Sequence, residues 1–541
     1  MKPFTKFKPK LEIKSHWLIL MASFYFAFVL NLSLWRFVLD RVEVTDISSF
    51  MFAATIPIFM LAPLYAVFNL IVVPYIGKPL LIILVLVSSG ANYFMYNLGV
   101  YIDLEMIRNV FETDVRETLD LTTLPKILWI FTTGIIPAAL IVVTKIKYQP
   151  FWKEAAKRGV SILATLAVAG IVAAALYKEY ASFGRNNKEA GRLLNPMNYI
   201  TATTRYFKRK IHARKEFQHI DDAAIRIPSD GQRPRVLVVV LGEAARAKNF
   251  SLQGYERETN PLLKEQDIVY FKDVISCGTS TAVSVPCMFS HLGRKYFNVD
   301  AARYYGTLLD VAQTAGYRVL FRGNNSGCKG ICDRVEVMDI NNPKYCAGRR
   351  HCYDEALLDG LPEILANIKH DTLIVLYQLG SHGPAYHDRY PERFRKFTPT
   401  CDTSNIQGCS QEHIVNTYDN TILYTDFIVS SAIDMLKKHP EYDAGLIYVS
   451  DHGQSLGENN IYLHGFPYAF APKEQKHVPM LVWLGKTMQG HIDYGCLKKE
   501  AARNPYPHYS HDNLFHSVLG ILDVRSHTYK AELDIFKNCR I

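Results

Sequence analysis

Four polar side chains with the chemistry of metal ligands lie within three residues of the ends of three apolar runs in this 541-residue chain. Glu243 follows the first run, His382 the second, and Asp451 with His452 the third. The runs are Val236–Leu241, Leu373–Leu379 and Leu446–Val449. A mixture of carboxylate and imidazole ligands suits Zn²⁺ in tetrahedral geometry. The Glu and the Asp-His pair would supply three ligands and leave one position open for a reacting group.

A hydroxyl-rich stretch, Ser276–Ala282, is the candidate for that open position. Its glycine and hydroxyl residues are typical of a loop that enters a helix. A Ser or Thr oxygen bound to zinc at a helix N-terminus would lose its proton more readily, and an anionic group that it attacks would meet positive potential. Metal and nucleophile together indicate phosphoryl or sulfuryl transfer. Taken singly, each of these hydroxyls is more often a helix cap. They are the hydroxyls of Thr279, Ser280 and Thr281 within the stretch and of Ser284 just beyond it.

These residues need a scaffold that brings distant parts of the chain together. From Arg233 onward, short apolar runs alternate with longer mixed segments, as in an α/β sheet flanked by helices. Continuous apolarity predicts strands buried on both faces. Ligands of open α/β sheets collect outside the carboxyl ends of the strands, so Glu243, His382 and the Asp451-His452 pair are expected to converge there.

The N-terminal part of the chain is built for lipid. Five segments have the length and apolarity of membrane-spanning helices, which need about 20 residues each. They are roughly 17–39, 50–73, 80–100, 124–143 and 160–177. We therefore predict a five-helix transmembrane domain over 1–177, a linker over 178–233 and a second domain over 234–541.

Charge and cysteine content place the second domain outside the cytosol. Lysines near the N-terminus and between the last two spans mark the cytoplasmic side, whereas the loop after the third span is acidic. An odd number of spans then puts everything after Tyr180 outside. All ten cysteines lie at or beyond Cys277, as expected on an oxidising side of a membrane.

Spacing suggests four local disulfides, Cys277–Cys287, Cys328–Cys332, Cys346–Cys352 and Cys401–Cys409. Cys496 and Cys539 are left to close a longer loop. A zinc-thiolate site built from the second and third pairs is the alternative.

The formal charge is +10, and nine lysines and arginines lie between Arg185 and Lys215. They predict either a solvated linker or amphipathic helices on an anionic membrane surface. Nucleic acid is not expected as a partner, because this segment faces away from the cytosol. The protein is expected to act as a monomer.

Several motifs together carry a resemblance to a known family. They are CGTSTAVSVP at 277–286, VLGEAAR at 240–246, GSHGP at 380–384, SDHG at 450–453, LGEN at 456–459 and YLH at 462–464. With the five spans, the basic linker and the cysteine spacing, they resemble the lipid A phosphoethanolamine transferases, a family that includes the mobile colistin-resistance enzymes.

The resemblance implies a Gram-negative inner-membrane protein whose periplasmic domain has the alkaline-phosphatase or sulfatase type of fold. It implies transfer of phosphoethanolamine from phosphatidylethanolamine to lipid A phosphate, and with it polymyxin resistance. Thr281 would be the nucleophile, and Glu243, Asp451 and His452 would hold Zn²⁺ with it. His382 and His464 would bind a second zinc or the transferred phosphate.

The resemblance also assigns substrate contacts. Asn325 and Lys329 would contact the phosphoethanolamine group, and Asn109 and Glu117 would help to hold the donor lipid. One position departs from the family pattern, because Gln454 stands where the family usually has Glu. A neutral amide cannot pair with the ethanolamine ammonium as a carboxylate does, which predicts an active enzyme that is slower or selects a different donor.

Three other functions stay open at this point. A sulfatase is one, since 284–288 partly echoes the sulfatase motif, although Met288 replaces its Arg. A transferase acting on periplasmic glucans and a membrane sensor without turnover are the others.

Overall fold

The computed structural model describes residues 11–42, 44–212, 216–227, 233–502 and 509–541. Contacts divide the chain into two compact units. We call Met1–Ile107 with Thr123–Arg205 the helical unit, and Arg108–Thr122 with Tyr206–Ile541 the sheet unit. The loop between the third and fourth spans thus belongs mainly to the sheet unit. The predicted boundaries at 177/178 and 233/234 remain a prediction.

Four helices of the helical unit are long and apolar enough to cross a membrane. They are α3 (Ile47–Ile71), α4 (Gly77–Leu98), the continuous run of α7 (Leu124–Ile130), η2 (Phe131–Ile135) and α8 (Ile136–Val143), and α9 (Phe151–Ala175). A bent pair makes a fifth if it forms one span: Ser15–Val29, which comprises α1 (Ser15–Phe24) and η1 (Tyr25–Val29), with α2 (Leu32–Leu39). These segments coincide with the five predicted spans.

Two short strands pair the N-terminal segment of the helical unit with the loop that follows α8. β1 (Leu11–Lys14) pairs in parallel with β2 (Thr144–Lys147), and Lys145 Nζ lies 3.0 Å from Glu12 Oε1. The N-terminal segment and the loop after α8 therefore lie at one end of the helical unit, as two segments on the same side of a membrane must. The lysines before residue 11 lie outside the described residues.

The basic linker is helical over much of its length. It contains α10 (Tyr177–Asn186), η3 (Lys188–Arg192) and α11 (Met197–His212). Both α-helices are amphipathic, and Arg205 and Lys208 are exposed on α11. Arg214 and Lys215 lie outside the described residues. That these helices lie on a membrane surface stays a prediction.

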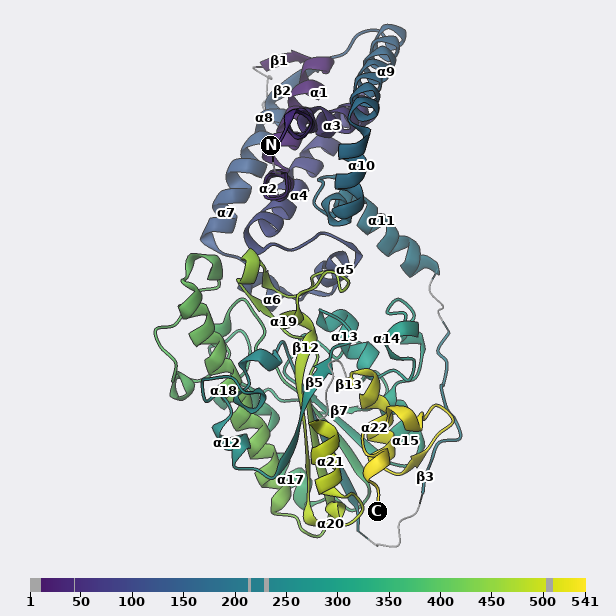
Figure 1. The fold of residues 1–541 in the computed structure, drawn as a ribbon, viewed down its shortest axis with the longest axis vertical. Coiled ribbons are helices and arrows are strands. Elements are labelled where there is room, and N and C mark those ends of the chain that lie inside the picture. The colour runs from purple at the N-terminus through teal and green to yellow at the C-terminus, as the bar shows by residue number, and fades with distance from the viewer. Residues whose placement is uncertain (1–10, 43, 213–215, 228–232, 503–508) are drawn as a thin grey trace, which may run out of the picture. The chain divides into compact units, whose positions relative to one another are not determined.

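The sheet unit is built on eight strands in the order β13-β5-β12-β9-β4-β8-β6-β7 (Figure 1). Their bounds are β13 (Tyr509–Ser510), β5 (Ile268–Ile275), β12 (His477–Leu484), β9 (Asp443–Ser450), β4 (Arg235–Gly242), β8 (Thr372–Tyr377), β6 (Arg318–Gly323) and β7 (Glu336–Val337). β9, β4, β8 and β6 are parallel neighbours, and β12 runs antiparallel between β5 and β9. The three predicted strands are β4, β8 and β9, although β8 ends at Tyr377 and not at Leu379.

Burial on both faces explains why these strands are continuously apolar. Every residue of β4, β8 and β9 is buried. Leu237, Val239 and Leu241 face a core shared with α15 (Leu308–Thr314) and α22 (Asp512–Ile521). The alternate residues of β4 point to the opposite face, because side chains of a strand alternate. On that side α18 (Gln411–Lys437) packs against β9 (Figure 1).

All ten cysteines form disulfides in the five predicted pairs. Four pairs close loops of at most ten residues, and Cys496–Cys539 joins positions 43 residues apart. The zinc-thiolate alternative is wrong, because its sulfur atoms are bonded to one another.

Candidate active site

Two neighbouring parallel strands carry the candidate metal ligands. Gly242, the last residue of β4, is paired with Ser450, the last of β9, so Glu243 and Asp451 leave the sheet side by side. One ligand atom from each of Glu243, Asp451 and His452 lies within 4.8 Å of the others. All three side chains are fully buried. The sheet edge therefore brings together residues that are more than 200 positions apart.

The pKa values and the unpaired oxygen of this cluster indicate a site that can bind a cation. Burial, and next the charge of Glu243, raise the pKa of Asp451 to about 7. Burial opposes the charge on His452, yet Asp451 and Glu243 raise its pKa to about 9. Asp451 Oδ2 is buried without a hydrogen-bond partner among the described residues. An orphaned carboxylate oxygen between a second carboxylate and an imidazole is a set of donors that fits a divalent metal such as Zn²⁺.

Thr281 lies against this cluster. It is the first residue of α13 (Thr281–Met288), and its Oγ1 lies 3.1 Å from Glu243 Oε2 and 3.1 Å from His452 Nε2. Ser280 occupies the N-cap position, but its side chain makes no capping hydrogen bond. The helix N-terminus provides unpaired N–H groups and positive potential next to the Thr281 hydroxyl. This is the arrangement that a phosphoryl-accepting hydroxyl needs.

The Glu243 carboxylate is oriented by two further groups. Asn325 Nδ2 donates to Glu243 Oε2 at 2.7 Å, and the Tyr377 hydroxyl donates to the same oxygen at 3.2 Å. Gly380 allows the loop after β8 to pass close to Glu243. Its φ is +53°, and a Cβ there would lie 2.8 Å from the Glu243 carbonyl oxygen. Residues larger than glycine would push this loop, and His382 with it, away from the cluster.

Two histidines border the cluster, and their surroundings shift their pKa values in opposite directions. The ring of His464 lies 4.4 Å from that of His452 and 5.7 Å from that of His382, between centroids. Burial, together with the charges of His452 and His382, holds the pKa of His464 well below its usual range. Burial opposes the charge of His382, but its hydrogen bond to Glu117 raises the pKa of His382. Of the two rings, His382 is therefore the more readily protonated.

Glu117 reaches the site from the loop between the predicted third and fourth spans. Its Oε1 lies 2.9 Å from His382 Nε2. Despite burial, that pairing and the charge of Lys329 lower the pKa of Glu117. His382 Nδ1 is buried and makes no hydrogen bond to the described residues, so this nitrogen is available to a ligand. The structure thus joins Glu117, His382 and the metal cluster in one site.

The three remaining residues that were predicted to contact substrate lie in different surroundings. Gln454 contacts His464, with Gln454 Oε1 2.9 Å from His464 Nδ1. Lys329 lies on the loop that also carries Asn325, and its Nζ donates to the Ser326 carbonyl oxygen at 3.0 Å. Asn109 lies on α5 (Leu104–Glu112), and its side chain forms no hydrogen bond to the described residues of the site.

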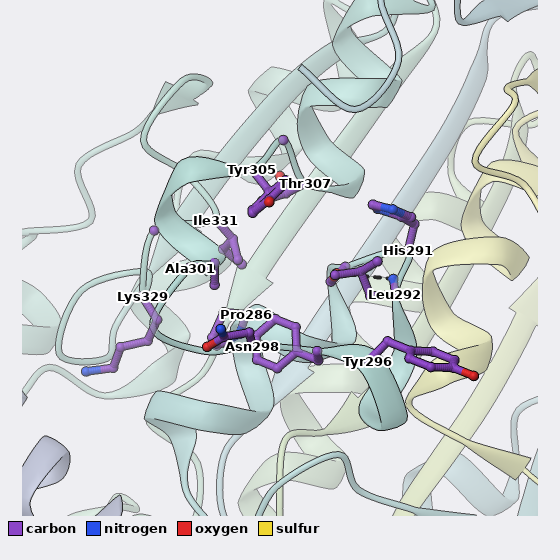
Figure 2. A pocket seen from close by; sticks show the side chains of 15 residues that line it. Pro286, His291, Leu292, Tyr296, Asn298, Ala301, Tyr305, Thr307, Lys329 and Ile331 are labelled. Atoms are coloured by element: carbon purple, nitrogen blue, oxygen red, sulfur yellow. Dashed lines mark hydrogen bonds between the residues drawn. The ribbon is translucent and has the colours of Figure 1, made fainter. Parts of the chain in front are cut away.

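A cavity of about 240 Å³ adjoins this region. Its lining comes from the second half of α13, the segment 290–307 and the loop 329–331. Figure 2 shows Lys329 at one end of the cavity and His291 with Tyr296 at the other. Aromatic and aliphatic side chains form much of the wall. The cavity shares Lys329 and α13 with the site described above.

The groups that hold the Thr281 loop on the sheet are not among the residues predicted from the sequence. His511 Nδ1 accepts from the Cys277 N–H at 3.1 Å, and His511 Nε2 donates to the Ser450 carbonyl oxygen at 2.9 Å. The Ser284 hydroxyl donates to the Asp451 carbonyl oxygen. The sequence indicates a helix cap or the start of a partial sulfatase motif for the hydroxyl at 284, and no pattern in the sequence distinguishes His511. Tyr377, as the last residue of a buried strand, could have been found from its position.

Two family models match different parts of this chain. Residues 60–211 match the family model "Phosphoethanolamine transferase EptA/EptB", and residues 235–524 match the family model "Sulfatase". Phosphoethanolamine transferase EptA of Escherichia coli strain K12 is 41% identical over 98% of both chains. Phosphatidylethanolamine transferase Mcr-1 of Escherichia coli is 39% identical over 76% of this chain and 79% of its own.

A solved structure extends the similarity to the whole fold. The integral membrane lipooligosaccharide phosphoethanolamine transferase A of Neisseria meningitidis has a TM-score of 0.95 and 38% identity, covering 98% of this chain and 99% of its own. The predicted fold class is confirmed, with N-terminal membrane helices followed by a sulfatase-like α/β domain. The protein is an inner-membrane protein, and its sheet unit is its periplasmic part. The chain belongs to the phosphoethanolamine transferase family of EptA.

Proposed function

We propose that this enzyme transfers phosphoethanolamine from phosphatidylethanolamine to a phosphate of lipid A, in two steps through Thr281. One observation carries the proposal: the Thr281 hydroxyl is 3.1 Å from both Glu243 Oε2 and His452 Nε2 at a helix N-terminus. The names of two relatives support the substrates. One is called a phosphatidylethanolamine transferase, and another a lipooligosaccharide phosphoethanolamine transferase.

Glu243, Asp451 and His452 would hold a zinc ion next to Thr281. When bound, the ion supplies positive charge that lowers the pKa of the Thr281 hydroxyl and neutralises charge on the phosphoryl oxygens. The orphaned Asp451 Oδ2 supports this assignment. Asn325 and Tyr377 keep the Glu243 carboxylate in place by donating to its second oxygen.

In the first step the Thr281 hydroxyl releases its proton to solvent, and its Oγ1 attacks the phosphorus of the donor lipid. The bond from phosphorus to the glycerol oxygen breaks, and diacylglycerol leaves with a proton. His382 is the better acid for this oxygen, because Glu117 raises the pKa of His382 and burial lowers that of His464. The product is phosphoethanolamine esterified to Thr281. Lys329 would add positive charge near the phosphate.

In the second step a phosphate oxygen of lipid A attacks the same phosphorus. The lowered pKa of His464 favours a neutral ring, which can accept the proton of the incoming phosphate. The bond to Thr281 Oγ1 breaks, and the threonine oxygen takes up the proton that His464 received. Membrane anchoring lets both lipids reach the site by lateral diffusion.

The modified lipid A carries an ammonium group on a phosphate. A membrane that contains this modified lipid A has a less negative surface. Cationic peptides such as polymyxin therefore bind to it more weakly. We therefore propose polymyxin resistance as the consequence of expression.

Intact-lipid mass spectrometry of cells with and without the protein tests the acceptor. Lipid A is expected to gain the mass of phosphoethanolamine, and Thr281→Ala is expected to abolish this gain. Rapid quenching of the wild-type enzyme with phosphatidylethanolamine should yield a Thr281 peptide with the same added mass. Full transfer by Thr281→Ala, or unmodified lipid A beside modified periplasmic glucan, would overturn the proposal.

A further inference from the structure

The segment between the predicted third and fourth spans contains a capped helix that belongs to the sheet unit. In α6 (Val115–Asp120) the Asp114 side chain accepts from the Glu117 N–H at 2.8 Å. Glu117 and Asp120 are three residues apart, and residues at this spacing share one face of a helix. Both carboxylates contact residues of the sheet unit, Glu117 at His382 and Asp120 at Arg389.

Asp120 is enclosed by three cationic or ionisable groups. Its Oδ2 lies 2.6 Å from Arg389 Nη2 and 3.2 Å from His351 Nε2, and its Oδ1 lies 2.8 Å from Arg350 Nη1. Asp120 is 2% exposed, and the Arg389 side chain is 1% exposed. Burial opposes ionisation, yet the hydrogen bond from His351 and the charge of Arg389 keep the pKa of Asp120 well below its usual range. The carboxylate is therefore ionised and fixed.

Arg389 extends this contact to the active site. Its Nε donates to the His382 carbonyl oxygen at 2.7 Å while its Nη2 binds Asp120. His382 is thus held twice by the same short helix: its ring binds Glu117 directly, and its backbone is bound through Arg389 to Asp120. Two attachments fix both the position of His382 and the rotation of its ring.

We propose that Asp120 and Arg389 are positioning residues that hold the Glu117–His382 pair in its reactive geometry. The inference depends on the proposed function in one respect, the role of His382 as the acid for the leaving oxygen. Loss of this network should impair turnover more than donor binding, because neither Asp120 nor Arg389 contacts the other candidate substrate-binding residues directly. The loop of residues 108–122 is then a part of the active site and not only a connection between spans.

Kinetics of the full-length enzyme in detergent, with phosphatidylethanolamine as donor, test the coupling. Asp120→Asn is expected to lower kcat by at least about tenfold with KM changed less than about threefold. Glu117→Gln should have a similar effect. Adding Asp120→Asn to Glu117→Gln should lower kcat by no more than about twofold further, because residues acting on one step are not additive.

Two further variants separate positioning from stability. Asp523→Asn is the matched control, since Asp523 pairs with the buried Arg235 at the other end of β4 from Glu243. It should lower Tm while leaving kcat within about twofold of wild type. Arg389→Lys keeps a positive charge beside Asp120 but removes the guanidinium group that binds both Asp120 and the His382 carbonyl oxygen. It should therefore lower kcat with little change in Tm.

A readout without turnover completes the test. Carbethoxylation of His382, followed by peptide mass spectrometry, should be faster in Asp120→Asn than in wild type or Asp523→Asn. Equal labelling rates, or effects of Asp120→Asn and Glu117→Gln that multiply, would overturn the inference. A wild-type enzyme that is inactive with phosphatidylethanolamine but shows the labelling difference would contradict the proposed function and still support the positioning role.

Discussion

Nδ1 of His464 lies 2.9 Å from Oε1 of Gln454, and Gln454 Nε2 lies 2.6 Å from the Tyr386 hydroxyl. An amide oxygen only accepts hydrogen bonds, so Nδ1 of His464 carries the proton and Nε2 keeps its lone pair. The position that departs from the family pattern therefore selects the neutral tautomer of His464. Glu117 has the opposite effect on His382. Two imidazoles with separated pKa values suit acid and base roles in one transfer.

Gln454→Glu is expected to change the pH dependence of the reaction. A carboxylate at hydrogen-bond distance would raise the pKa of His464. The acidic limb of the pH–rate profile should then move to higher pH. Tyr386→Phe removes the other partner of Gln454 without adding charge, so it should lower the rate without moving the limb. An acidic limb that is the same in Gln454→Glu and wild type would contradict the role assigned to His464.

The metal cluster is the part of the site that the sequence predicts best. Glu243 and Asp451 follow continuously apolar runs, and parallel strands place their carboxyl ends at one edge of the sheet. The paired ends of β4 and β9 make that edge. The five spans and the cysteine pairs follow equally from local composition and spacing.

The supporting residues depend on tertiary structure that no local pattern encodes. Asp120 lies in an acidic loop where nothing distinguishes it from Asp114, yet one is buried among arginines and the other caps a helix. Glu117 was assigned by resemblance alone. Its contact with His382 arises because the loop joins the sheet unit and not the helical unit that precedes and follows it in sequence.

Metal affinity should rise steeply with pH. Without metal, the pKa of Asp451 is raised to about 7 and that of His452 to about 9, so protons compete with the metal for both groups. Zinc affinity should increase about tenfold per pH unit between these values and about a hundredfold per unit below the lower one. Competition with a chromophoric chelator at several pH values measures this slope.

Asp426 provides the control for that experiment. Burial raises its pKa to about 7 as well, but its carboxylate accepts from the Leu262 and Leu263 N–H groups, away from the cluster. Asp451→Asn should remove bound zinc and flatten the slope, whereas Asp426→Asn should leave both unchanged. A pH-independent zinc affinity in the wild type would rule out these three ligands.

The longest disulfide loop should contribute most to stability. Cys496–Cys539 spans 43 residues and Cys328–Cys332 only four. Loop-closure entropy gives about 4 kcal/mol for the first and about 2 kcal/mol for the second. Replacing both cysteines of each pair by serine should therefore lower Tm more for the 496/539 variant. Equal losses of Tm would show that restriction of the unfolded chain is not the dominant effect.

Acid should destabilise the sheet unit through two buried histidines. Burial lowers the pKa of His511 to about 3 and that of His516 to about 4. Both rings are 1% exposed, and His516 Nδ1 accepts from the Lys530 N–H at 3.1 Å. The ordinary pKa of histidine is 6.5. As the pH falls below 6.5, these two histidines bind protons in the unfolded chain but stay neutral in the folded chain. Stability is then complete above about pH 6.5 and falls by about 2 kcal/mol per histidine at pH 5.

The Tm of the full chain in detergent, measured between pH 8 and pH 5, should show this decline. His516→Gln removes one titrating group, so its Tm should be lower than that of wild type at pH 8 but fall less on acidification. His491, whose side chain is 54% exposed, supplies the control, because His491→Gln removes a histidine that is not buried. The wild-type slope should persist in that variant. If His516→Gln also kept the wild-type slope, the acid sensitivity would have to come from groups other than this buried ring.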